Sequence, residues 1–215
     1  MDQATIINQT IEYVRDFFGR DGSGHDWWHI YRVHQLAKTL AVAEGGDLFI
    51  IEMAALLHDL DDYKVNQNQP TCKAEQWLAQ SGVEEEISHR VLEVIEQVSF
   101  KGANVDTTAA TPEAKIVQDA DRLDAIGAIG IARAFAFGGS RGRLIYDPEF
   151  SPVRHNSFWE YKMNKTATIN HFYEKLLLLK DRMQTATGRS MAETRHDFME
   201  RFLEQFFQEW DVKNH

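Results

Sequence analysis

The sequence predicts an all-α protein. Apolar residues recur three and four positions apart through most of the 215 residues, which is the spacing of one face of a helix. No run of alternating apolar and polar residues long enough to suggest a strand is present. The chain has only four prolines, and no segment is repeated or of low complexity. We therefore expect a helical bundle rather than a sheet.

Helix signals divide the first half of the chain. Residues 5–18 read as a first helix and residues 26–44 as a second, which the pair Gly45–Gly46 ends. Asp47 can cap a third helix, on which Ile51, Ala54, Ala55 and His58 share one side. A loop over 66–70 and two more helices, over 71–80 and 83–99, follow.

The second half opens with a strong helix start. Thr111 can cap the helix, Pro112 suits its first position, and Glu113 places an acid in its first turn. A further helical stretch over 126–137 could continue this helix. Residues 138–152 then form a long polar loop with several Gly and Pro, a composition typical of lids or binding loops.

Two long helices are expected over 155–211. The first is marked by apolar residues three and four apart, at Ile169, Phe172, Leu176, Leu179 and Met183. The second is marked in the same way by Met199, Leu203, Phe206 and Trp210. Together they predict a C-terminal helical hairpin packed on the main bundle. The length suits one domain, residues 1–215.

Composition limits the partners and the compartment. A formal net charge of −10 argues against general attraction to duplex nucleic acid or to anionic membranes. Cys72 is the only cysteine, so no internal disulfide can form. The N-terminal residues lack a basic segment followed by an apolar one, and the apolar runs are too short to cross a bilayer. We expect a cytoplasmic protein.

Ionisable side chains on apolar helix faces are the strongest functional signal. His29 lies in line with Val33 and Leu36, so it points inward. His58 and Asp59 end an apolar helix, in the segment LLHDLDD. Burying such groups is costly unless a cation compensates them. Two imidazoles and two carboxylates suit a divalent ion with open positions for water, so a later aspartate is expected to join them.

The segment VQDADRLDAIG supplies the candidates for that aspartate. Asp121 and Asp124 both extend the apolar face of their helix. Arg122 is an alternative partner for one of these acids, which would make the pair structural. The residue pattern alone leaves the choice between the two aspartates open.

Three segments resemble the motifs of the HD superfamily of metal-dependent phosphohydrolases. They are HDWWHIYRV (25–33), LLHDLDD (56–62) and DADRLDAIG (119–127), so the motif core covers about residues 20–137. The resemblance is closest to small bacterial single-domain, nucleotide pyrophosphohydrolase-like members. It implies an HD-domain helical bundle. It also implies that His29, His58, Asp59 and Asp121 bind the metal, with Asp124 orienting one of these ligands.

The resemblance also implies a reaction, in which a metal-activated water attacks phosphorus. Asp62 is the expected proton-handling acid, with Asp61 as its competitor. Arg32, one helical turn after His29, is expected to bind phosphate oxygens, and Lys64 and Lys101 are weaker candidates. Arg141 and Arg143 could serve a lid over the site.

One metal ion is expected, because His89 is the only histidine between Asp59 and Asp121 and dinuclear relatives use more. The types of ligand residue do not determine whether the ion is Mn²⁺, Mg²⁺, Ni²⁺, Zn²⁺ or Fe²⁺. The expected substrate is a small phosphate compound, in the first place a nucleotide, with pyrophosphate as a product. The alternatives are a phosphomonoesterase or phosphodiesterase of the same fold, or a sensor that binds metal or nucleotide without catalysis.

Overall fold

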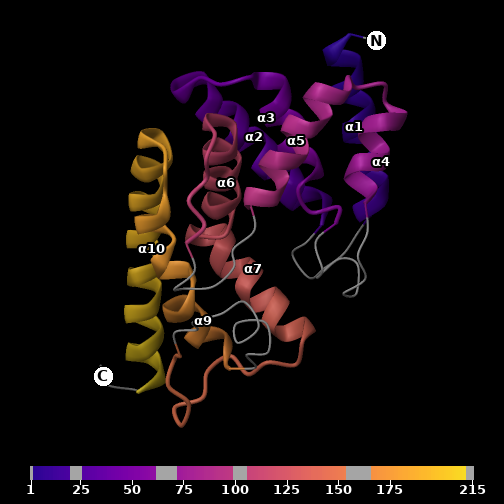
Figure 1. Ribbon diagram of the computed structural model, residues 1–215. Helices are drawn as coiled ribbons and strands as arrows, with labels where there is room; N and C mark the ends of the chain where they lie inside the picture. The colour runs from indigo at the N-terminus through magenta and orange to yellow at the C-terminus, as the bar shows by residue number, and fades with distance from the viewer. Residues whose placement is uncertain (1, 20–25, 62–71, 99–105, 154–165, 212–215) are drawn as a thin grey trace.

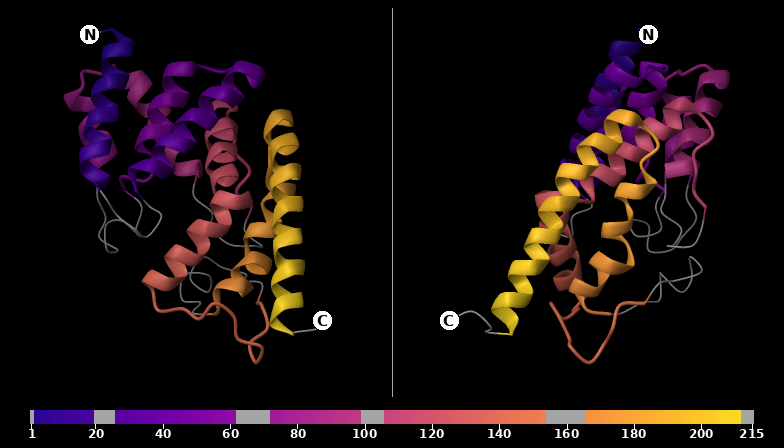
Figure 2. Two further views of the ribbon diagram at one scale, coloured as in Figure 1. Left: turned by 180° about the vertical axis from the view of Figure 1, so that it is seen from behind. Right: turned by 90° about the vertical axis from the view of Figure 1, so that its left-hand side faces the viewer.

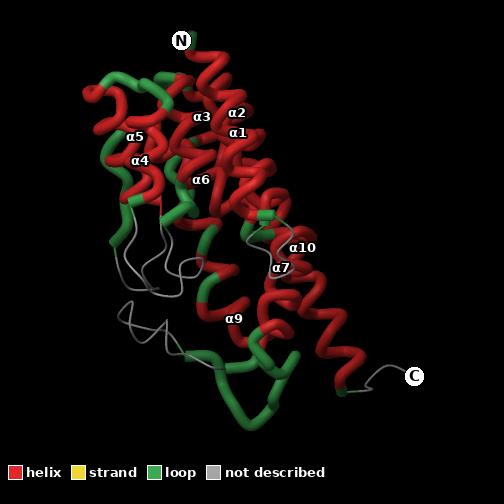
Figure 3. Tube along the Cα trace, turned by 90° about the vertical axis from the view of Figure 1, so that its right-hand side faces the viewer, coloured by secondary structure: helices red, strands yellow, loops and turns green. Residues whose placement is uncertain are grey.

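The computed structural model describes residues 2–19, 26–61, 72–98, 106–153 and 166–211. Within these ranges the protein consists of helices and loops, with no strand (Figure 3), as the sequence predicts. The α-helices are α1 (Gln3–Phe18), α2 (Trp27–Glu44), α3 (Leu48–Leu57), α4 (Lys73–Gln80), α5 (Glu85–Val98), α6 (Pro112–Asp124), α7 (Gly127–Ser140), α9 (Thr168–Glu174) and α10 (Ala186–Trp210). Two 3₁₀ turns, η1 (Leu176–Leu178) and η2 (Lys180–Arg182), lie between α9 and α10.

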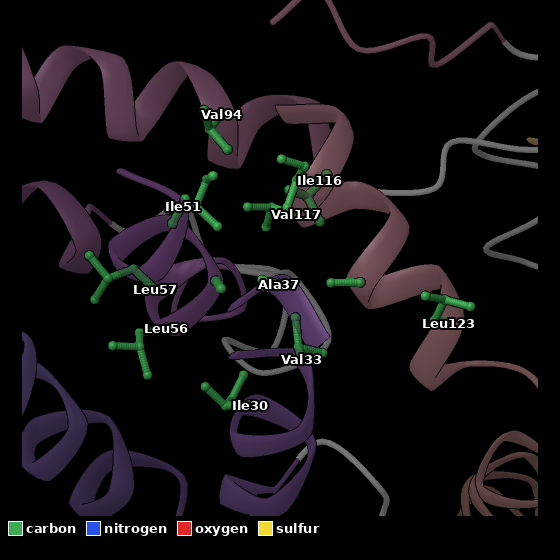
Figure 4. Close-up of a cluster of buried hydrophobic side chains, with 14 of the residues drawn as sticks. Ile30, Val33, Ala37, Ile51, Leu56, Leu57, Val94, Ile116, Val117 and Leu123 are labelled. Carbon is green, nitrogen blue, oxygen red and sulfur yellow. The ribbon is translucent and has the colours of Figure 1, made fainter. Parts of the chain in front are cut away.

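The helices α1 to α6 gather at one end of the molecule, and α7, α9 and the C-terminal part of α10 extend from it (Figure 1). α2 packs on α3 and α6, and α5 closes the group by contacting α3 and α6. Figure 4 shows the apolar side chains that join these four helices, among them Ile30, Ile51, Val94 and Val117. All four are almost fully buried, so this core fixes the three helices that carry the candidate metal ligands.

Helix starts follow the local rules used to predict them. The carboxylate of Asp26 accepts the His29 N–H at 2.9 Å, and that of Asp47 accepts the Phe49 N–H at 3.1 Å. The Thr111 hydroxyl accepts the Ala114 N–H at 3.1 Å. Each cap satisfies a backbone donor that the first turn of a helix leaves unpaired. The predicted caps at Asp47 and Thr111 are therefore confirmed.

The structure excludes one continuation that the sequence left open and contradicts one predicted boundary. Residues 126–137 do not continue α6, because the chain turns at Gly127 with φ +74° and a separate helix begins there. That helix runs to Ser140, so the loop begins at 141 instead of 138. The predicted loop at 66–70 lies outside the described residues.

The C-terminal region also differs from the prediction. The second long helix is present as α10, which runs beside α6 and α7 (Figure 2). The first is broken into α9, η1 and η2. Side chains of α6 bind the end of this segment: Arg122 donates to the Arg182 carbonyl, and Asp119 accepts the N–H groups of Gln184 and Thr185 at 2.8–3.0 Å. These bonds pair the carbonyl group of residue 182 and the N–H groups of residues 184 and 185, where the chain leaves the 3₁₀ turn.

None of the described helices combines the length and the apolar character needed to span a lipid bilayer.

Candidate metal centre

His29 lies in the first turn of α2 with only 1% of its surface exposed. Its Nδ1 atom is 2.8 Å from Oδ2 of Asp124, a carboxylate at the end of α6. A histidine that donates Nδ1–H to a carboxylate keeps the lone pair on Nε2, the usual state of a metal-binding imidazole. Burial and the charge of Arg133 lower the pKa of His29, but hydrogen bonds to Asp124 and Asp59 outweigh them and raise it.

His58 is held in the same tautomer by a different acceptor. α3 ends at Leu57, and the Nδ1 atom of His58 is 2.9 Å from the carbonyl oxygen of Ala55. Its Nε2 atom is buried and has no hydrogen-bond partner in the part of the chain that the structure describes. A buried nitrogen of this kind is costly unless a ligand occupies the space beside it. The predicted helix end at this histidine is confirmed, and it lets His58 and Asp59 face the same point.

Asp59 and Asp121 complete the group around the two Nε2 atoms. Asp59 oxygens lie 3.3 Å from Nε2 of His29 and 3.4 Å from Nε2 of His58. Oδ1 of Asp121 lies 3.6 Å and 3.9 Å from the same two nitrogens. Ligand atoms about 2.1 Å from a shared ion in a tetrahedral arrangement are about 3.4 Å apart. Donor atoms of His29, His58 and Asp121 lie close enough together to hold a divalent ion, and the Asp59 oxygens lie beside both imidazoles.

Asp124 occupies a different place from Asp121. Its side chain is 2% exposed, and besides His29 it contacts two arginines. Arg32 donates from Nε to Oδ1 at 2.6 Å and from Nη2 to Oδ2 at 3.1 Å, and Arg133 donates to Oδ2 at 2.9 Å. Burial alone would raise the pKa of Asp124, but His29 and the two arginines lower it well below its usual range. Asp124 is thus a permanent carboxylate behind His29.

Arg122, the alternative partner for the acids of α6, points elsewhere. It donates to the Thr107 hydroxyl at 3.0 Å and to the Arg182 carbonyl, and burial lowers its pKa to about 10. Asp119 accepts hydrogen bonds from three donors, the N–H groups of Gln184 and Thr185 and the Thr185 hydroxyl. These two residues hold the start of α10 and leave Asp121 facing the histidines.

Of the residues expected to bind substrate or move protons, one lies beside the centre, one caps a helix and three lie outside the described residues. Arg32 is 30% exposed beside the centre, with its guanidinium already bound to Asp124. Asp61 accepts the backbone N–H groups of Lys73 and Ala74 at 2.9 Å and 3.0 Å, so it caps α4. Three further candidates, Asp62, Lys64 and Lys101, lie outside the described residues.

Two remaining expectations concern residues farther from the centre. His89 is 73% exposed and lies 3.9 Å from Glu85 on α5, away from the four candidate ligands. Arg141 and Arg143 lie over the ring of Phe137, at 5.4 Å and 5.8 Å from its centroid. They therefore cover the end of α7 in this structure.

Arg133 is the residue of this site that sequence reasoning missed. It lies on α7, in the otherwise uncharged stretch GAIGIARAFAFGG, and its side chain is 18% exposed. A lone cation on a small apolar helix needs a carboxylate partner when it is buried. That signal was available in the sequence, but only the fold identifies Asp124 as the partner.

Comparison with known proteins agrees with this arrangement. The HD domain family model matches residues 27–126, a range that contains all four candidate ligands. The Bacillus subtilis protein YpgQ is 41% identical over 208 residues, covering 95% of this chain and 94% of YpgQ. A crystal structure of YpgQ in complex with ADP has a TM-score of 0.78, with 36% identity in the structural alignment and 97% of each chain covered.

Two further solved structures extend the comparison. A protein from Lactobacillus plantarum has a TM-score of 0.88 and 36% identity, over 99% of this chain and 100% of its own. An HD-superfamily hydrolase from Bacillus thuringiensis has a TM-score of 0.74 and 46% identity, over 98% of this chain and 99% of its own. With this identity along nearly its whole length, the chain belongs to the HD superfamily of hydrolases.

Proposed function

We propose that this protein is a phosphohydrolase that uses one divalent metal ion to cleave a nucleotide or a related phosphate compound. The observation that carries the proposal is the convergence of two buried imidazole Nε2 atoms with the carboxylates of Asp59 and Asp121. Both imidazoles have their Nδ1 atoms engaged on the opposite side. The donor atoms therefore face one another, as a ligand set should.

A single ion accounts for this set. His29, His58, Asp59 and Asp121 would hold it, and the exposed His89 would not supply a second site. Bound there, a divalent ion supplies an acidified water and a Lewis acid for a phosphoryl oxygen. The ligands suit Mn²⁺, Mg²⁺, Ni²⁺, Zn²⁺ and Fe²⁺ alike, so availability decides which is used.

Local charge supports an anionic substrate. Asp59, Asp121 and Asp124 contribute three negative charges, and Arg32 and Arg133 contribute two positive ones. A divalent ion would turn this net −1 into a net +1, in a protein whose formal net charge is otherwise −10. Phosphate binding is thereby tied to metal binding. Arg32, partly exposed beside the ligands, is the guanidinium best placed to meet phosphate oxygens.

Proton handling is assigned to Asp62, with Asp61 as its competitor. Both oxygens of Asp61 accept backbone N–H groups of α4, which favours a structural role for that carboxylate. Lys64 and Lys101 stay as weaker proposals for phosphate contacts. The ADP complex of YpgQ supports a nucleotide as the ligand class, and pyrophosphate release is our preferred outcome.

A phosphate screen on metal-depleted protein tests the proposal. The protein is resupplied separately with Mn²⁺, Mg²⁺, Ni²⁺, Zn²⁺ or Fe²⁺ and given nucleoside triphosphates, nucleoside monophosphates and a phosphodiester. Pyrophosphate and orthophosphate are measured separately. Pyrophosphate with a nucleoside monophosphate supports the preferred reaction, whereas orthophosphate from monophosphates or cleavage of the diester supports the alternative esterases.

A matched pair of double variants provides the control. His58→Ala with Asp59→Ala removes two proposed ligands, and His89→Ala with Glu85→Ala removes an exposed histidine–acid pair. We expect the first to lose more than ~100-fold in activity, because outer contacts to metal ligands alone are worth 10–100-fold. The second should match the parent. Equal activity of all three proteins would overturn the proposal, and metal-dependent nucleotide binding without turnover would identify a sensor.

A further inference from the structure

Two exposed aromatic side chains on α2 lie next in sequence to residues of the candidate metal centre. Trp28 is 59% exposed and Tyr31 is 42% exposed, both in the first turns of α2. Their flanking residues His29 and Arg32 belong to the centre described above. Aromatic rings of this size are costly to leave in water unless something covers them.

Helix geometry places these rings on the same side of the α2 axis as Arg32. Successive residues of an α-helix are about 100° apart. Measured from His29, Arg32 lies about 60° around the helix axis, Trp28 about 100° and Tyr31 about 160°, all in the same direction. Arg32 therefore separates the ligand His29 from the two aromatic rings. A compound with phosphates at the metal centre would extend past Arg32 toward Trp28 and Tyr31.

The aromatic pair is held in place by the core. Trp27 is 8% exposed and lies 6.1 Å from the ring of Tyr31, between centroids. The rings of Tyr31 and Trp28 meet edge to face, with centroids 5.8 Å apart and planes at 82°. The buried Trp27 thus packs against Tyr31, and Tyr31 in turn packs against Trp28. Rings fixed on a helix in this way lose little freedom when a ligand stacks on them.

Exposure alone would not distinguish these residues, since scattered apolar side chains are normal on protein surfaces. Other exposed aromatic side chains, such as Phe198 and Trp210 on α10, belong to elements that carry none of the candidate ligands. Trp28 and Tyr31 combine exposure with a position one and two residues from the candidate metal ligand His29. That combination indicates a ligand-binding surface continuous with the centre.

We propose that Trp28 and Tyr31 form a stacking site for the base of a nucleoside phosphate whose phosphates lie at the metal centre. The proposal rests on the proposed phosphohydrolase function and specifies the substrate as a nucleoside phosphate. Every nucleobase has a flat π face, so stacking accepts all of them. The protein should therefore favour substrates that carry a base but discriminate weakly among bases.

Comparing substrates with and without a base tests this site. Trp28→Ala should raise KM for nucleoside triphosphates about 5- to 150-fold, the range that base–aromatic stacking supplies. Inorganic triphosphate, which has no base, should be cleaved with unchanged KM. Trp28→Phe should restore most of the affinity, and Tyr31→Ala should act in the same direction as Trp28→Ala. Val42→Ala, at an 89% exposed position of the same helix, is the matched control.

Binding provides a readout separate from turnover. Calorimetric titration of the metal-loaded protein with ADP and with inorganic diphosphate should show that Trp28→Ala weakens ADP alone. Equal effects on ADP and diphosphate, or no effect on either, would overturn the stacking site while leaving the phosphohydrolase intact. If the parent cleaves inorganic triphosphate as efficiently as nucleotides, the expected preference for a base is contradicted and the stacking site fails. If it cleaves no phosphate compound with any metal, the proposed function itself fails.

Discussion

Oδ2 of Asp124 lies 2.8 Å from Nδ1 of His29, although 95 residues separate the two side chains in the sequence. The same carboxylate binds Arg32 and Arg133, so it joins α2, α6 and α7 at one buried point. This contact aims Nε2 of His29 at Asp59 and Asp121. The candidate centre thus depends on a residue that does not face the proposed ion.

Replacing Asp124 by Asn should weaken metal binding about 10–100-fold, the usual cost of losing a carboxylate behind a ligating histidine. Asn keeps the shape but removes the charge that Arg32 and Arg133 share. Calorimetric titration of the metal-free protein with Mn²⁺ or Zn²⁺ measures the change. Asp16→Asn, at an exposed position on α1, is the control. Unchanged affinity in Asp124→Asn would show that His29 is oriented by other contacts.

Arg32→Lys should lower kcat/KM at least ~10-fold although the positive charge is kept. Arg32 makes two parallel hydrogen bonds to Asp124, and a lysine ammonium cannot reproduce that geometry. Losing one hydrogen bond to a charged partner costs about 1.5–3 kcal/mol, and each 1.4 kcal/mol corresponds to a factor of ten. Steady-state kinetics on the substrate found in the screen measure the effect. The exposed Arg15→Lys should behave as the parent does.

Local chemistry made much of the fold predictable. The caps at Asp47 and Thr111 bind backbone groups two or three residues away, so a short window of sequence contains both partners. The inward direction of His29 and His58 follows from helix periodicity in the same way, and both are buried.

Long-range contacts were not predictable by these means. Residues 168–183 have the spacing of one long helix, but α9 ends at Glu174, and Asp119 and Arg122 bind the backbone of residues 182, 184 and 185 after the 3₁₀ turns. The different positions of Asp121 and Asp124 also emerge only when α2 and α6 pack together, because both extend the same helix face. The contact between Arg133 and Asp124 depends on the turn at Gly127, because this turn sets the direction of α7.

His34 should make stability fall as pH drops below about 6.5. Burial lowers its pKa, although Glu52 at 2.9 Å opposes the shift and Lys38 adds to it. Above the ordinary histidine value both states are neutral and the contribution is complete. As pH falls toward the lowered value, the unfolded chain takes up a proton that the folded chain does not, and stability is lost.

Urea unfolding of metal-free protein between pH 7.5 and 5 measures this effect. Relative to His34→Gln, the parent should lose stability as the pH decreases. His89→Gln, at an exposed position, should follow the parent. The opposite trend, a parent that gains stability relative to His34→Gln at low pH, would mean that the ion pair with Glu52 outweighs burial.

Gly188→Ala should destabilise the protein by about 1–3 kcal/mol, the usual cost of overpacking. A Cβ at this position would lie 2.6 Å from Oδ2 of Asp119 and 2.6 Å from the hydroxyl of Thr185. Neither atom is free to move, because both hold the first turn of α10. Gly139→Ala is the control: it lies on α7 with no atom within 4 Å of the new Cβ, so higher helix propensity should leave stability equal or slightly raised. Equal thermal midpoints for Gly188→Ala and the parent would contradict this packing.

Metal removal should lower the thermal midpoint of the parent but not that of the His58→Ala, Asp59→Ala variant. An ion that binds only the folded state stabilises it by about 2.7 kcal/mol at a hundredfold excess over Kd. In a chain of this length that corresponds to a shift of ~5–10 °C. Differential scanning calorimetry with chelator and with each divalent ion measures the shift, and its dependence on ion concentration yields Kd. If no ion changes the thermal midpoint of the parent, a metal centre at His29, His58, Asp59 and Asp121 is excluded. An equal shift in parent and variant would mean that the ion binds elsewhere.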